Sequence, residues 1–128
     1  GDVPTAVKNL LTSTKRLQEV LKLWSLDQAT ESGVSDVYVQ IGHEFNVTIS
    51  AFAYHQIALT DIHSIPLELR SVLELCLAEE PSPATLAQFM PDLRKVLFKL
   101  LKGLQRRQDN WQAVTRGFGA SRTSLHSQ

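Results

Sequence analysis

The chain has little of what builds disulfide-stabilised, membrane-spanning or metal-binding proteins. A single cysteine, Cys76, cannot form a disulfide within the chain, which favours a reducing compartment. No uninterrupted run of about 18 apolar residues occurs, so no membrane-spanning helix is predicted. Histidines and cysteines at the close paired spacing of metal sites are also missing. We therefore expect neither a metal nor another cofactor.

Recognisable catalytic motifs are missing as well. His43 and Glu44 begin like the helix motif of zinc proteases, but that motif needs a second histidine three residues after the glutamate, where Val47 stands. Gly33, Gly42 and Gly103 stand alone, and no glycine-rich phosphate loop occurs. No nucleophile, histidine and acid can be grouped by their spacing. The sequence therefore predicts a protein that is not an enzyme.

The chain carries no net formal charge, but its basic and acidic residues are unevenly distributed along the sequence. The chain has 13 basic and 13 acidic residues, which excludes a global attraction to nucleic acid or membrane. Residues 1–23 carry a net charge of +2, residues 24–91 of −8 and residues 92–128 of +6. This segregation indicates that the ends pack against the middle, within one chain or between two, or that the basic end meets an acidic partner.

Apolar residues at helical spacing are the main positive feature. Near the start they recur at steps of four and three, which predicts a helix over residues 4–25. The same spacing follows Pro91 and Asp92 and predicts a long helix that ends near Thr115. Two such seams exceed what one small core needs, so a homodimer is predicted. The residues assigned to a dimer or core seam are Leu10, Leu17, Leu21, Trp24, Leu97, Leu100, Leu104 and Trp111.

The middle of the chain completes an all-α prediction. Residues 33–55 are apolar on most sides, so we expect a central helix in which a close neighbour offsets the cost of Gly42. A shorter helix is expected over residues 66–80, and another short one from Pro83 that ends before Pro91. The predicted fold is a bundle of three long and one or two shorter helices over residues 1–115, and the predicted homodimer is formed by two such bundles. Residues 116–128, rich in Gly, Ser and Arg, are predicted to be a linker-like tail.

Basic residues form a stripe on the last helix. Lys95, Lys99, Lys102 and Arg106 follow at steps of four, three and four, with Arg107 beside them; we call these five residues the basic stripe. It has three interpretations: a solvated face, a partner for the acidic middle of the chain, or a contact for an acidic protein surface or anionic lipid. Nucleic acid is disfavoured because no aromatic residues interleave the stripe.

Three stretches resemble a known family. They read KNLLTSTKRLQEVLKLWS near the start, VSDVYVQIGHEFN in the middle and VLFKLLKGLQRRQ near the end. Together they resemble the N-terminal domain of the fungal bud-site-selection and actin-interacting cell-polarity protein, a formin partner and polarisome component. The resemblance spans about residues 3–110.

The resemblance implies a non-enzymatic scaffold in the cytoplasm and at the cell cortex, at sites of polarised growth and division. It implies cortical and polarity proteins as partners of this domain, and also microtubule ends. Actin and the formin would be bound by a C-terminal region that this sequence does not contain. The family brings no catalytic, cofactor or metal residues. The alternative, based on the residues alone, is a module that binds anionic membrane surfaces through the basic stripe.

Overall fold

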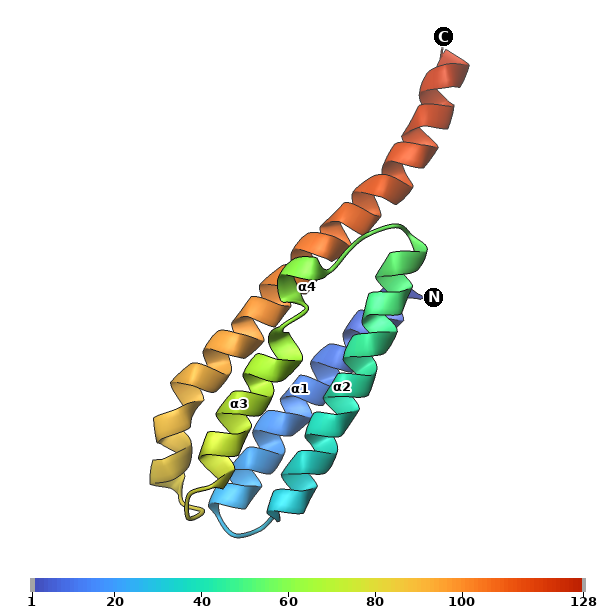
Figure 1. The fold of residues 1–128 in the computed structure, drawn as a ribbon. Coiled ribbons are helices and arrows are strands. Elements are labelled where there is room, and N and C mark those ends of the chain that lie inside the picture. The colour runs from blue at the N-terminus through green and yellow to red at the C-terminus, as the bar shows by residue number, and fades with distance from the viewer. Residues whose placement is uncertain (1, 128) are drawn as a thin grey trace.

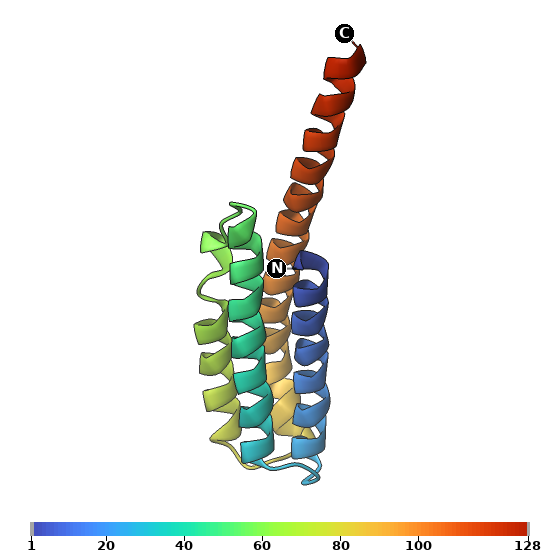
Figure 2. The same cartoon turned by 90° about the vertical axis from the view of Figure 1, so that its right-hand side faces the viewer.

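The computed structural model describes residues 2–127, with side chains described for residues 2–113, and it is a four-helix bundle. The helices are α1 (Val3–Ser25), α2 (Glu31–Tyr54), α3 (Ile65–Leu77) and α4 (Pro83–Ser127). One 3₁₀ turn, η1 (Thr60–Ile62), lies in the connection between α2 and α3. The helices run alongside one another and alternate in direction, with the α1–α2 and α3–α4 connections at the same end (Figures 1 and 2). The prediction of an all-α helix bundle is confirmed.

Side-chain caps define where the helices begin. The Gly33 N–H donates to the Thr30 hydroxyl oxygen at 3.0 Å, so Thr30 caps α2. The helix therefore begins at Glu31, two residues before the predicted start at Gly33. The Thr85 N–H donates to the Ser82 hydroxyl oxygen at 3.0 Å, which places the start of α4 where the sequence predicts it.

The sequence predicts that a short helix ends before Pro91, and the structure shows no such end. Helix α4 runs without interruption through Pro91, although proline lacks an N–H and its ring crowds the preceding turn. Apolar residues contact the core on both sides of Pro91, with Phe89 and Met90 before it and Leu93 and Val96 after it. We attribute the continuity to this burial, which offsets the missing hydrogen bond.

The far end of α4 also differs from the prediction. The helix was expected to end near Thr115, but its backbone remains helical to Ser127. The last turns project beyond the bundle (Figure 1). The division into a bundle domain at residues 1–115 and a linker-like tail at residues 116–128 stays a prediction, now with a helical backbone in the tail.

Helix α2 is not a central helix, and that prediction was wrong. It buries one face, through residues such as Ile41, Phe45 and Phe52, while Val39 and Tyr54 on its other side are 67% and 77% exposed. Helix α1 contacts both α2 and α4, and buries more of its residues than α2 does. The four helices share one core instead of surrounding one of their number.

The two predicted seams meet inside a single chain. Leu97 and Trp111 are partly buried against the core, and the other six seam residues are buried in it. Those six are Leu10, Leu17, Leu21, Trp24, Leu100 and Leu104. Since these side chains are used within one chain, the seams no longer supply an argument for a dimer.

Gly103 in α4 and Gly42 in α2 stand in opposite surroundings. A Cβ on Gly103 would lie 2.3 Å from Cγ2 of Ile62, a buried residue of η1, so the turn packs directly on the α4 backbone at this point. A Cβ on Gly42 would meet nothing within 4 Å, so the close neighbour expected there is missing. Gly103 is required by packing, whereas Gly42 only weakens its helix.

The substitutions Gly103→Ala and Gly42→Ala should therefore change stability in opposite directions. We expect Gly103→Ala to lower the free energy of unfolding by about 1–3 kcal/mol, because Ile62 must move within a packed core. We expect Gly42→Ala to raise it by up to about 1 kcal/mol, the difference in helix propensity. Urea denaturation followed by circular dichroism measures both. A Gly103→Ala variant at least as stable as the unchanged chain would contradict the packing role.

Candidate functional site

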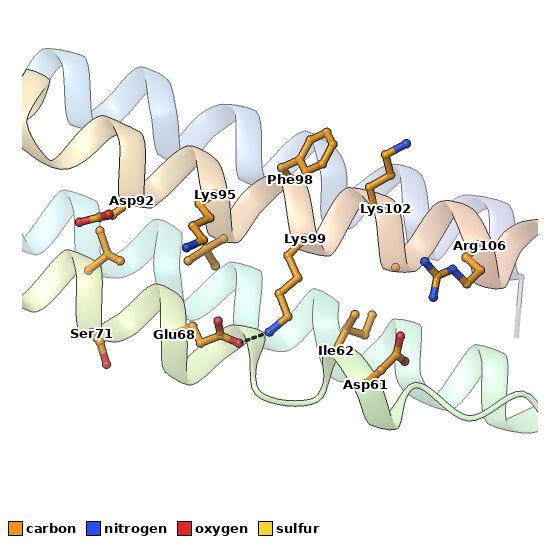
Figure 3. Close-up of a pocket in the computed structure, with 13 residues that line it drawn as sticks. Asp61, Ile62, Glu68, Ser71, Asp92, Lys95, Phe98, Lys99, Lys102 and Arg106 are labelled. Atoms are coloured by element: carbon orange, nitrogen blue, oxygen red, sulfur yellow. Dashed lines mark hydrogen bonds and ion pairs between the residues drawn. The ribbon is translucent and has the colours of Figure 1, made fainter.

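A groove between α3 and α4 brings most of the basic stripe together. It encloses about 810 Å³ and is open to solvent along its length. Four residues of the basic stripe line its α4 side: Lys95, Lys99, Lys102 and Arg106. Acidic residues also line it, with Glu68 on α3, Asp61 on η1 and Asp92 on α4 (Figure 3). The stripe thus faces both solvent and part of the acidic middle of the chain.

Lys99 is held within the chain by a carboxylate of α3. Its Nζ lies 3.0 Å from Oε2 of Glu68, and the Ser64 hydroxyl donates to the same oxygen at 2.7 Å. These two hydrogen bonds, that of Ser64 first, lower the pKa of Glu68 because they favour its charged form. The stability linked to Glu68 is therefore present above its ordinary pKa of 4.5, and is lost as the pH falls through the lowered value.

Arg107 fixes the connection between α2 and α3. Its Nε donates to the Ala58 carbonyl oxygen at 3.0 Å, and its Nη2 pairs with the Asp61 carboxylate. The Arg107 side chain is only 15% exposed, so these contacts are better shielded from water than those of a surface ion pair. Lys99 and Arg107 therefore pair with carboxylates of the acidic middle of the chain, as the second interpretation of the basic stripe states.

The other three residues of the basic stripe are exposed. Within the described side chains, Lys95, Lys102 and Arg106 form no ion pair. The Lys102 Nζ lies 5.6 Å from the centre of the Phe98 ring, within the range of a cation–π contact. Lys95 points toward α3 and Arg106 points toward Ile62 and Asp61, whereas Lys102 and Phe98 point away from α3 (Figure 3). These three cations are available to a partner.

Sequence reasoning missed the apolar residues that flank the groove. Phe98 on α4 is 59% exposed and Leu75 on α3 is 64% exposed. Leu75 lies one helical turn after Ser71, which lines the groove. On each of these helices the sequence has more apolar residues than one buried stripe can hold, and this excess could have indicated that some of them stay exposed.

Tyr38 and Cys76, which lie outside the groove, serve the packing of the bundle. The Tyr38 hydroxyl donates to the Pro66 carbonyl oxygen at 2.9 Å and so connects α2 to α3. Burial raises the pKa of Tyr38, against a smaller lowering by Arg70. Burial likewise raises the pKa of the Cys76 thiol, which keeps it protonated and unreactive. Among the described residues, no three His, Cys, Asp or Glu side chains are grouped so as to hold a metal ion.

Residues 4–112 match the family model described as the Aip3p/Bud6 N-terminal domain. The chain belongs to this family. The match starts in the first turn of α1 and ends beyond Trp111 in α4, so the family domain and the helix bundle coincide. The resemblance seen in the sequence is confirmed, and membership links the chain to cell polarity and to regulation of actin.

Two further comparisons add no relatives. Searches of curated proteins and of solved structures gave no match. Over the part of the chain that the structure describes, no helix has both the length and the hydropathy needed to cross a membrane.

The neighbours Arg106 and Arg107 allow a matched test of the internal contacts. We expect Arg107→Ala to lower the free energy of unfolding by about 1–3 kcal/mol, because it leaves the Ala58 carbonyl and the Asp61 carboxylate without their donor. Arg106→Ala should change it by less than about 0.5 kcal/mol, since Arg106 is exposed. Urea denaturation of both variants decides this, and equal losses would contradict the role assigned to Arg107.

Proposed function

We propose that the chain is the non-enzymatic targeting domain of a regulator of the actin cytoskeleton and cell polarity. The family match, which spans all of the bundle, supports this proposal. In it, the bundle binds cortical and polarity proteins at sites of polarised growth and division. Microtubule ends are a further class of partner in the proposal. A C-terminal region outside this chain binds actin and the formin and so helps the formin to nucleate filaments.

The arrangement of the bundle suits a docking role. Its core is formed within the chain, so the outer faces of α2, α3 and α4 are free to meet other proteins. A stable bundle can present such faces with little loss of conformational freedom on binding. The proposal therefore assigns targeting to exposed surfaces and assigns the buried seams to folding alone.

Targeting by the chain itself can be tested in fungal cells. The chain fused to a fluorescent protein should concentrate at growth sites and at the division site, because the proposal places the docking surfaces within residues 1–115. A matched fusion that carries the core substitution Leu17→Asp should be diffuse, since a buried charge unfolds the bundle. Diffuse fluorescence of the unchanged chain, at normal expression and with a folded bundle, would contradict the proposal.

We also propose a homodimer, with an interface formed by α2 and not by the two seams. Val39, Val47 and Tyr54 are exposed and follow at steps of eight and seven, which places them along one side of α2. A two-fold, antiparallel pair of α2 helices would place Val47 against its copy and Val39 against Tyr54. Pairing would cover the second apolar face of α2 and double the number of attached C-terminal regions, which raises their effective concentration.

Val47→Glu tests the dimer. We expect light scattering after size exclusion to show a dimer of the unchanged chain at a concentration on the order of tens of micromolar. Val47→Glu should be monomeric, because like charges would then face each other across the two-fold axis. Leu67→Glu is the control, since Leu67 is an exposed apolar residue on α3. A monomeric unchanged chain, or a dimer that tolerates Val47→Glu, would remove this part of the proposal.

A membrane surface is the alternative partner for the basic stripe. The proposal ranks it second because Lys99 and Arg107 are already engaged with Glu68 and Asp61, which leaves three exposed cations for lipid headgroups. Stable attachment to anionic membranes generally needs several such contacts, each worth about 1 kcal/mol. Co-sedimentation with anionic vesicles that is lost on replacing Lys95, Lys102 and Arg106 by Glu would favour the alternative.

A further inference from the structure

The groove between α3 and α4 combines unbalanced positive charge with exposed apolar side chains. Lys99 pairs with Glu68, and Arg107 pairs with Asp61. Three cations of the groove, Lys95, Lys102 and Arg106, are in no described ion pair, and Asp92 is the one lining carboxylate of which the same is true. Asp92 lies at one end of the groove, before Lys95 (Figure 3). The rest of the groove is therefore positive and suits an acidic occupant.

Apolar contacts are available on both sides of these charges. Phe98 is exposed on α4, and Leu75 is exposed on α3 within one turn of the groove residue Ser71. The apolar face of an amphipathic helix that lies in the groove can cover such side chains, as in helix-in-groove recognition. A lone acidic loop would leave them uncovered.

The spacing of the cations fits a helix as the occupant. Lys95 and Arg106 are 11 positions apart on α4, with Lys102 between them, and this separation is about 16 Å or three helical turns. A second helix that lies along α4 can present carboxylates at the same steps of seven and four. We propose that the groove between α3 and α4 binds an acidic amphipathic helix of a partner protein, as a fifth helix added to the bundle.

The shape of the site favours a helix over a lipid surface. Lys95 points across the groove toward α3 and Arg106 points toward Ile62 and Asp61, and not outward as a flat membrane would require (Figure 3). Lys102 alone of the three points away from α3. The groove has walls from two helices and a volume of about 810 Å³, which admits the side chains along one face of a helix. This inference rests on the proposed function, because a docked cortical protein is what would supply the helix.

A designed peptide tests the groove without knowledge of the natural partner. The probe is a fluorescein-labelled helix of about 20 residues, long enough to be partly helical in water. It carries Glu at positions i, i+7 and i+11 and leucines beside them, and its control carries Gln in place of Glu. Fluorescence anisotropy with the whole 128-residue chain should show binding of the Glu peptide that weakens with salt. The Gln peptide should bind about tenfold more weakly.

Two triple variants separate the groove from general charge. The groove variant carries Lys95→Glu, Lys102→Glu and Arg106→Glu. Its control carries the same change of charge at the exposed α1 residues Lys8, Lys15 and Lys22. We expect the groove variant to bind about tenfold more weakly or worse, and the control to stay within about threefold. Circular dichroism melts confirm that both are folded, as expected for exposed positions.

Phe98→Ala separates insertion of a helix from charge attraction alone. We expect this variant to weaken binding of the Glu peptide by about tenfold, because an exposed aromatic residue covered by a partner contributes most of its area on binding. The control is Leu23→Ala on α1, which is also exposed and lies outside the groove. No effect of Phe98→Ala would overturn the proposal of a helix that packs on this side chain.

The remaining outcomes each overturn the proposal. Failure of the Glu peptide to bind, or equal losses in the two triple variants, would show that the groove is no helix site. Anionic vesicles that compete with the peptide, and whose binding the groove variant abolishes, would assign the groove to a membrane. If the peptide fails to bind while the fluorescent chain still concentrates at growth sites, the groove proposal falls and the proposed targeting function stands.

Discussion

Burial of one apolar face of α1 against both α2 and α4 is the constraint on which the rest of the bundle depends. Leu10, Leu17 and Leu21 are almost completely removed from water along this face. Each such leucine contributes about 1.5–3 kcal/mol on burial. Since α1 contacts two helices at once, it fixes the distance between α2 and α4. Helix α2 and helix α4 then satisfy the core with one face each, and their other faces remain exposed.

Helix α3 packs mainly on α4 and much less on α2. The α2–α3 pair shares few contacts, and the Tyr38 hydroxyl bond to the Pro66 carbonyl is its specific polar connection. Ile62 of η1 packs on the bare backbone of Gly103, and Arg107 holds the connection before η1. Together with the direct packing of α3 on α4, these contacts set the position of α3. The groove between the two helices therefore depends on how the α2–α3 connection is anchored.

Local patterns in the sequence predict the helices well, but contacts between distant residues decide the site. Apolar steps of three and four gave the extents of α1 and α2 to within a few residues, because they reflect the period of one helix. The central position assigned to α2 and the break at Pro91 were wrong, because tertiary packing decides which apolar face is buried and whether a proline is tolerated. The division of the basic stripe depends on Lys99 meeting Glu68, 31 residues away, and on Arg107 meeting Asp61, 46 residues away. The local spacing of residues cannot predict contacts between residues so far apart in the sequence.

The basic stripe shows how one helix serves folding and binding at once. Arg106 and Arg107 are neighbours, yet successive residues of a helix point about 100° apart. Arg107 is therefore turned toward the α2–α3 connection and stabilises it, while Arg106 lines the open groove. Because different side chains carry the two tasks, the exposed cations can change with a partner at little cost to the fold, whereas Lys99 and Arg107 are constrained by their internal carboxylates. The binding properties of the groove can thus vary independently of the bundle that forms it.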